Sequence, residues 1–198
     1  MKKSTAKVLL AHSSNDLYGA SKILINIVEL LLSEGYIVYL FLPEKGPLLE
    51  NNIIKKCNVE IVEFGVFRKR YFNFLGLINR LYYIIKSTFI IRSFILKNKI
   101  DLVYTNTSTV VSPTFAAYLS KVPSISPLRE IPFGSILYTK FLTNIFNLFS
   151  EKIIAVSNST RDFWIKKGVV RNKIMVINNG FNFDFSSTKK TFKIIYSY

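Results

Sequence analysis

Short apolar runs recur along this chain, and helix-length stretches separate most of them. Near the end of the chain, Lys152–Ser157 and Lys173–Asn178 flank the helix-length stretch Asn158–Lys167. Runs of this length, bounded by polar residues, are typical of strands that are buried on both faces. Earlier runs of the same kind lie at Lys7–His12, Tyr36–Leu42, Val59–Phe64, Leu102–Thr105 and Pro123–Pro127. Strands that alternate with helices predict an α/β Rossmann-like fold, a parallel sheet with helices on both faces.

The intervening stretches have the length and apolar spacing of helices. The expected helices are Ser21–Glu34, Leu48–Lys56, Tyr71–Lys97, Val110–Ser120 and Tyr138–Phe149. Gly35 stands where a glycine ends a helix, and Pro113 suits a first helical turn. In such folds ligands bind at the carboxyl ends of the strands, so functional residues are expected there.

Length and composition limit the class of protein. The 198 residues are enough for one domain with a substantial core, and the single Cys57 excludes an internal disulfide. A reducing cytoplasm therefore fits. We expect no transmembrane helix, because the most apolar long stretch, Leu77–Leu96, contains Arg80, Lys86 and Arg92.

The formal net charge is +15, and the positive charge is concentrated in one window. Residues 64–100 contain no Asp or Glu, and their cations alternate with aromatic and aliphatic residues. We interpret this window as an amphipathic helix whose basic face, with Arg80 and Lys86, contacts an anionic membrane surface. The alternative is a long helix that covers the sheet and has a solvated basic side. Nucleic acid is not an expected partner, because no helix-turn-helix, zinc or RNA-binding signature is present.

Four segments, in this order, resemble the N-terminal domain of family-four retaining glycosyltransferases, which have the GT-B architecture. The segments are Gly19-Ala20 at the start of a helix, Asp101–Asn106, Ile153–Ser157 and Lys173–Gly180. They span about residues 6 to 182. The resemblance implies one Rossmann-like half of a GT-B fold. In that architecture the N-terminal domain usually binds the acceptor, and the C-terminal domain binds the sugar nucleotide.

The resemblance implies a donor-diphosphate contact at Gly19 and Ala20. Amides at a helix start attract anions, and glycine permits close approach of the backbone. The family usually has Gly-Gly here, so Ala20 is a departure. An ordinary strand-to-helix turn is the alternative explanation of this pair.

The expected acceptor-binding residues are His12, Asn106, Arg129 and Glu130. Many relatives have a histidine near the position of Arg129, which cannot act as a base because its guanidinium stays protonated. It can bind a phosphate or a sugar hydroxyl. The structural alternatives are an Arg129–Glu130 pair, a buried His12 and an Asn106 that caps the following helix.

Four further residues are expected at the edge of the cleft: Ser157, Arg161, Asn179 and Gly180. Ser157 also has the position of a helix cap, and Asn179-Gly180 has the composition of a turn. For Ser157 the helix cap is the preferred explanation, whereas for Asn179-Gly180 a turn and a place at the cleft explain the sequence equally well.

The end of the chain resembles the start of a second domain. We assign residues 1–182 to the Rossmann-like domain and 183–198 to a linker and the first strand of a C-terminal domain that is otherwise absent. The Gly, Lys-Gly and paired glutamates that follow that strand in relatives do not occur here.

The resemblance therefore implies half of an enzyme. It predicts a hexosyltransferase-type activity in bacterial surface polysaccharide or glycolipid assembly, inactive unless a C-terminal half, which can be separately encoded, completes it. The donor would be a nucleotide sugar, the acceptor a sugar or lipid-linked sugar, and no metal or other cofactor is expected. The location would be the cytoplasm or the inner face of the membrane. The alternatives are a non-catalytic module that docks on a membrane or partner, and the remnant of a truncated gene.

Overall fold

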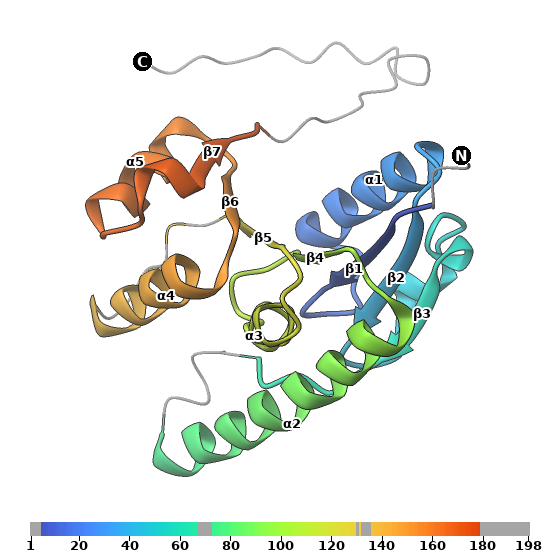
Figure 1. Cartoon of the computed structure of the whole chain (residues 1–198), viewed down its shortest axis with the longest axis horizontal. Helices are drawn as coiled ribbons and strands as arrows, with labels where there is room; N and C mark the ends of the chain where they lie inside the picture. Colours follow the sequence, from blue (N-terminus) through green and yellow to red (C-terminus); the bar gives the residue numbers. More distant parts are fainter. Residues whose placement is uncertain (1–4, 67–72, 130, 132–135, 179–198) are drawn as a thin grey trace, which may run out of the picture.

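The sheet that the alternating pattern predicts is present and wholly parallel. The computed structural model describes residues 5–66, 73–129, 131 and 136–178 (Figure 1). Among them, seven strands pair in the order β3-β2-β1-β4-β5-β6-β7. The strands are β1 (Lys7–Ala11), β2 (Ile37–Leu42), β3 (Asn58–Ile61), β4 (Leu102–Thr105), β5 (Ser124–Leu128), β6 (Lys152–Ala155) and β7 (Ile174–Val176). The Rossmann-like α/β prediction is confirmed.

The order of the strands reverses between β1 and β4. The chain moves outward from β1 through β2 to β3, then returns to place β4 on the other side of β1. Val8 lies in register with Leu102, and Ala11 with Thr105. In an open parallel sheet, the loops that leave the carboxyl ends of the two strands at such a reversal run to opposite faces and leave a crevice for ligands.

The helices cover the two faces of the sheet unequally. They are α1 (Gly19–Ser33), α2 (Phe74–Asn98), α3 (Ser112–Leu119), α4 (Ile136–Phe149) and α5 (Asn158–Lys166). On one face α2 and α3 pack on β1, β2 and β4, and α4 and α5 pack on β5, β6 and β7. Among the described residues, α1 is the only α-helix of the opposite face, and Figure 1 shows it across the sheet from α2 and α3.

Local sequence explains where several elements begin and end. Gly35 adopts a φ of +81° directly after α1, as expected of a glycine that ends a helix. The side chain of Asn73 caps α2 by accepting a hydrogen bond from the Gly76 amide at 2.8 Å. Pro113 lies in the first turn of α3, where its missing N–H costs nothing.

The prediction of a helix at Leu48–Lys56 is wrong. This segment forms two 3₁₀ turns, Pro47–Glu50 and Ile54–Lys56. Asn51 separates them, because its Oδ1 accepts a hydrogen bond from the Ile53 amide at 2.9 Å and its backbone is extended. Such side-chain bonds to nearby amides compete with helix continuation.

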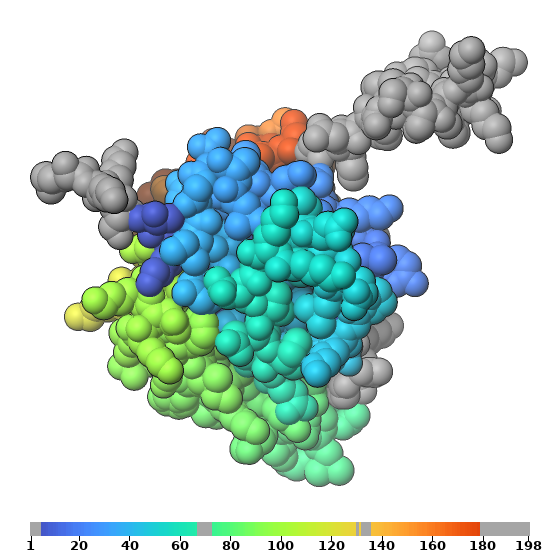
Figure 2. Space-filling model, turned by 90° about the vertical axis from the view of Figure 1, so that its right-hand side faces the viewer, coloured from blue at the N-terminus to red at the C-terminus, as the bar shows by residue number. Residues whose placement is uncertain are grey.

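The long helix expected in the basic window is present as α2, but its exposed side is not the polar, basic face that was expected. Ser87 is fully buried, and its hydroxyl donates to the Tyr83 carbonyl at 2.6 Å. The exposed side is instead largely apolar, with Leu81, Tyr82 and Phe89 each more than half exposed. Figure 2 shows α2 in green along the lower rim of the molecule.

By length and composition, α2 is the one helix in the described part of the chain that could cross a membrane. Its C-terminal half nevertheless packs in the core, where Ile91 and Ile95 are buried between the sheet and α3. Core helices pass the same composition test, so this result does not identify α2 as a membrane span.

Part of the sheet on the α1 side is exposed. Next to α1 lies an apolar groove of about 340 Å³ that continues over β5 and β6. Ile177, which lines this groove, is 53% exposed, and Met175 of β7 is 48% exposed. Since parallel sheets are normally covered on both faces, this surface is unusual for a complete fold. Residues 183–198, predicted to be a linker and a strand, lie outside the described residues.

Candidate functional site

The reversal between β1 and β4 brings three predicted site residues together. His12 follows β1, Asn106 follows β4 and Arg129 follows β5, so all three lie at the carboxyl edge of adjacent strands (Figure 1). The Asn106 amide donates to the Ala11 carbonyl at 2.8 Å, which extends the ladder and places the two side chains opposite each other. Residues 12, 106 and 129 therefore form one cluster, although they are far apart in sequence.

Hydrogen bonds join this cluster into one chain. His12 Nδ1 lies 3.0 Å from Asn106 Nδ2, and His12 Nε2 lies 3.0 Å from Ser21 Oγ. Ser21 donates to Asp16 Oδ1 at 2.9 Å. At the other end, Arg129 donates through Nη2 to Asn106 Oδ1 at 2.8 Å and through Nε to the Asn106 carbonyl at 3.2 Å. The chain thus runs without a break from a carboxylate to a guanidinium.

Burial determines the charge states of the side chains in this hydrogen-bond network. His12 is fully buried, and this burial, with a smaller opposing effect of Asp16 and a lowering effect of Arg129, lowers its pKa from 6.5 to about 4. Burial also raises the pKa of Tyr104, whose hydroxyl accepts from Arg129 Nη2 at 3.2 Å. Near neutral pH the histidine is therefore uncharged and the arginine is the cation of the cluster.

Arg129 lines a small pocket at this edge. The pocket has a volume of about 270 Å³, and its wall is rich in hydroxyl groups from the loops after β1 and β4. Its lining residues are Ser13, Ala20, Val66, Thr107, Ser108, Thr109 and Arg129. One guanidinium surrounded by hydroxyls suits a phosphate or a sugar, both of which offer several oxygens.

The start of α1 forms another wall of this pocket. The N-cap residue Tyr18 provides no side-chain hydrogen bond to the first turn. Gly19 is exposed, and a Cβ added there would meet no atom within 4 Å. The Ala20 carbonyl accepts from Asn106 Nδ2 at 3.0 Å, so this turn is tied to the cluster. Asp16 already occupies part of the helix start by accepting from the Tyr18 amide, which leaves the side with Ala20 for a ligand.

The other predicted site residues lie elsewhere. Ser157 caps α5 by accepting from the Thr160 amide at 3.1 Å, and Arg161 pairs with the adjacent Asp162 at 2.8 Å. Neither lines the pocket. Arg80 and Lys86 belong to α2. Glu130, Asn179 and Gly180 lie outside the described residues, so their predicted roles remain predictions.

Two of the predicted acceptor-binding residues are inaccessible here. The side chains of His12 and Asn106 are both fully buried behind Arg129. The structure therefore favours an indirect role for them, while Arg129 and the loop after β4 line the pocket directly. Asp16, Ser21 and Tyr104 belong to this network but were not predicted from the sequence. For Asp16 and Ser21, the available signal was the polar residues around the start of an otherwise apolar helix.

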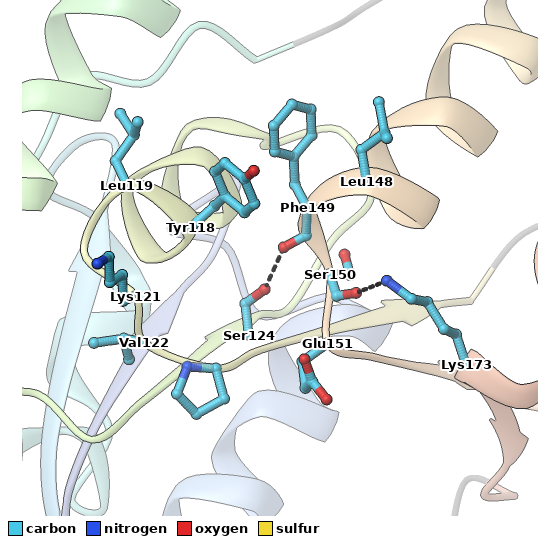
Figure 3. A pocket seen from close by; sticks show the side chains of 11 residues that line it. Tyr118, Leu119, Lys121, Val122, Ser124, Leu148, Phe149, Ser150, Glu151 and Lys173 are labelled. Atoms are coloured by element: carbon cyan, nitrogen blue, oxygen red, sulfur yellow. Dashed lines mark hydrogen bonds between the residues drawn. The ribbon is translucent and has the colours of Figure 1, made fainter.

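A larger hollow lies at the opposite edge of the sheet. It has a volume of about 640 Å³ and is bounded by the loop before β5 and the end of α4 (Figure 3). Two of its polar side chains already bond to backbone carbonyls: Ser124 donates to the Phe149 carbonyl at 3.1 Å, and Lys173 Nζ to the Ser150 carbonyl at 3.0 Å (Figure 3). Because it lies at the amino ends of the strands, we do not regard it as the functional site.

Solved structures with the same architecture span about twice the length of this chain. The Anabaena protein HepE, solved in complex with UDP and glucose, superposes with a TM-score of 0.66 at 22% identity, over 89% of this chain and 45% of HepE. The lipopolysaccharide outer core galactosyltransferase WaaB gives 0.62 at 13% identity, over 88% and 46%. The UDP-N-acetylglucosamine 2-epimerase of Rickettsia bellii gives 0.60 at 15%, over 87% and 44%.

At these identities the neighbours establish the fold, and they include a galactosyltransferase and an epimerase. The chain has the architecture of one half of each of them. No curated protein matches the sequence. The sequence profile of Glycosyltransferase Family 4, however, matches residues 18–185, which is most of the chain, and the protein therefore belongs to this family.

Proposed function

We propose that this protein is the acceptor-binding half of a nucleotide-sugar-dependent glycosyltransferase of the hexosyltransferase type. Its pathway would be the assembly of a bacterial surface polysaccharide or glycolipid. The observation that carries the proposal is the pocket in which Ala20, at the start of α1, and Arg129 meet the hydroxyls of the loop after β4. The family membership and the likeness to WaaB, a lipopolysaccharide transferase, support it.

The proposed chemistry rests on charge and position. The donor diphosphate would lie against the first turn of α1, where helix amides and the dipole favour anions. Arg129 would bind a phosphate or hydroxyl oxygen from the pocket floor. The chain's contribution would be to orient the acceptor and to stabilise negative charge on the departing diphosphate, with no metal and no other cofactor.

The second half of the cleft would come from a C-terminal domain. This chain spans 44–46% of the length of the three neighbours named above. The exposed apolar surface over β6 and β7 supports a partner in this position, because water-exposed Met175 and Ile177 would be buried by it. Alone, the chain is expected to show no sugar transfer and only weak nucleotide binding. Transfer from a nucleotide sugar by the purified chain would contradict this half-enzyme proposal.

Binding of inorganic pyrophosphate tests the pocket directly. We expect pyrophosphate to bind the wild-type chain in the millimolar range, and Arg129→Gln to weaken binding about tenfold or more, because a charge-assisted hydrogen bond is lost. Isothermal titration calorimetry or NMR titration would measure both. Arg171→Gln is the matched control, since it removes the same charge from an exposed turn away from the pocket. Equal binding by Arg129→Gln and wild type would refute the assignment.

A second proposed role, docking on an anionic membrane at the inner face of the cell membrane, is favoured by α2. Leu81, Tyr82 and Phe89 are exposed on one side of this helix. Lys86 is exposed, and its ammonium lies 5.9 Å from the centre of the Tyr82 ring, so a cation stands beside the apolar surface. Apolar side chains flanked by cations suit the boundary between headgroups and acyl chains.

Vesicle co-sedimentation tests this role. With anionic vesicles, the double charge reversal Arg80→Glu/Lys86→Glu is expected to reduce binding by more than about tenfold, since each cation contributes about 1 kcal/mol near such a surface. The control Lys166→Glu/Lys167→Glu makes the same change at the C-terminal end of α5, over the other half of the sheet. Equal losses in both variants would indicate nonspecific attraction by net charge and would contradict a membrane face on α2.

A further inference from the structure

We propose that His12 is a positioning residue, which holds the Asn106 amide so that Arg129 is fixed in the wall of the pocket. The side chain of His12 never reaches the pocket, because it is fully buried. It acts through a chain of hydrogen bonds in which each proton has one place. This inference rests on the proposed role of the pocket as an anion site.

The charge of Asp16 fixes which groups donate and which accept at this end of the network. Burial alone would raise the pKa of Asp16, but hydrogen bonds from the Tyr18 amide, Ser14 and Ser21 outweigh this effect and hold the pKa below its ordinary value. An ionised carboxylate can only accept, so the hydroxyl proton of Ser21 points to Asp16. Ser21 Oγ is then an acceptor toward His12 Nε2, and Ser14 Oγ, which also donates to Asp16, lies 3.4 Å from the same nitrogen. Nε2 must therefore carry the imidazole proton.

The second ring nitrogen is therefore a pure acceptor. A neutral imidazole has one N–H, so with Nε2 protonated His12 Nδ1 presents a lone pair toward Asn106 Nδ2. The other amide hydrogen of Asn106 is used by the Ala20 carbonyl at 3.0 Å. Both hydrogens are thus committed on the side away from Arg129.

The direction of these two hydrogen bonds fixes which end of the Asn106 side-chain amide faces Arg129. With the NH₂ group of Asn106 facing His12 and Ala20, Oδ1 faces the guanidinium and accepts from Nη2 at 2.8 Å. The backbone carbonyl of Asn106 accepts from Arg129 Nε at 3.2 Å, so Asn106 holds one edge of the guanidinium by two hydrogen bonds. If the amide turned over, its NH₂ group would face the Arg129 cation, which has no acceptor, and this grip would be lost.

Few charged groups act on the ring. Asp16, from the loop before α1, favours the charged form, whereas Arg129, from the end of β5, disfavours it. Tyr104 of β4 contacts Arg129 rather than the imidazole. Protonation of Nδ1 would place a donor against the Asn106 amide donor, so the arrangement requires the neutral ring that burial provides.

The first test is ¹⁵N NMR of the imidazole ring. Because the chain has only one histidine, every imidazole signal belongs to His12. In ¹⁵N NMR spectra of the wild-type chain near neutral pH, we expect Nε2 to be protonated and Nδ1 to have the shift of an unprotonated acceptor. A ring with the proton on Nδ1, or an equal mixture of tautomers, would overturn the inference.

A pair of conservative variants gives the second test. In His12→Asn, the side-chain oxygen can occupy the Nδ1 position and still accept from Asn106. In His12→Gln, the longer side chain can keep the bond to Ser21 while the acceptor near Asn106 is lost. We expect His12→Gln to weaken inorganic pyrophosphate binding about tenfold, toward the level of Arg129→Gln, and His12→Asn to recover binding to within about threefold of wild type.

The outcomes separate this inference from the proposed function. Urea unfolding of both variants would show that each is folded before binding is compared. Wild-type affinity in folded His12→Gln, or equal losses in both variants, would overturn the positioning role while leaving the pocket intact. A wild-type chain that fails to bind pyrophosphate but has the expected tautomer would instead refute the pocket's anion role and, with it, the function assigned to this positioning.

Discussion

Replacing Trp164 by alanine is expected to lower the free energy of unfolding by about 3–5 kcal/mol, since a large core side chain is lost and leaves a cavity. Trp164 is 1% exposed, and its ring packs edge-to-face against Phe146 and Phe163, with 5.7 Å between ring centres in each pair. It joins α5 to α4 over the sheet. Such a loss is a large share of the roughly 5–15 kcal/mol that stabilises a typical domain.

Urea unfolding followed by far-UV circular dichroism would measure this loss, because Trp164 is the only tryptophan and its fluorescence disappears with it. The control is Trp164→Phe, which keeps an aromatic ring and is expected to cost less than about 2 kcal/mol. Trp164 Nε1 has no hydrogen-bond partner among the described residues, so phenylalanine breaks no bond there. A small effect of Trp164→Ala would mean that α5 is not integral to the core.

Acidification is expected to destabilise the protein through His12. Its pKa is about 4 in the folded chain and near 6.5 when unfolded, so between these values only the unfolded chain binds the proton. The contribution is present in full above about pH 6.5 and is lost as the pH falls to about 4, by up to about 3 kcal/mol. At about pH 5 the expected loss is about 2 kcal/mol.

Comparison of the wild type with His12→Asn at about pH 7 and about pH 5 isolates this effect, because all other titrating groups are shared. Asp16, whose pKa is also lowered, acts in a separate window, below its ordinary value of 3.8. The variant should therefore lose less stability than the wild type over the interval from pH 7 to pH 5. Identical losses would show that the buried ring is not held neutral.

The family membership and the exposed surfaces together shape how this protein should be studied. The chain spans less than half of its structural neighbours and leaves apolar groups on β7 and α2 exposed. The pocket is the part of the proposed cleft that this chain builds by itself, from the ends of β1, β4 and β5. The pyrophosphate experiments therefore use this chain alone, whereas the proposed sugar transfer would require the proposed second domain.

The regular elements could be predicted because their signals are local. Leu102–Thr105 was predicted residue for residue, and the start of α5 was predicted from Ser157, which does cap the helix. The alternation of apolar runs and helices was enough to predict a parallel sheet. A helix between two strands returns the chain to the end of the sheet where the first strand began, so the two strands run in the same direction. The same rule placed His12, Asn106 and Arg129 at one edge.

The predictions were wrong where a side chain competes for a backbone amide, or where tertiary packing decides which side of a helix is buried. Asn51 ends a helix that the apolar spacing of Leu48–Lys56 favours, because one side-chain oxygen captures the Ile53 amide. On α2, Ser87 faces the core while Leu81 and Tyr82 face water, because the helix rotates to fit Ile91 and Ile95 against the sheet. Helical periodicity alone does not say which side the rest of the protein covers.

By itself, the sequence determined the family, the α/β class and the edge of the sheet at which the proposed site lies, because periodicity and motif order are properties of neighbouring residues along the chain. Only the tertiary structure decided that His12 and Asn106 are buried, that Arg129 is gripped twice by Asn106, and that Asp16 and Ser21 belong to the same network. The physical reason is that burial and hydrogen-bond geometry depend on atoms from distant segments, which come within reach only when β1, β4 and β5 lie side by side.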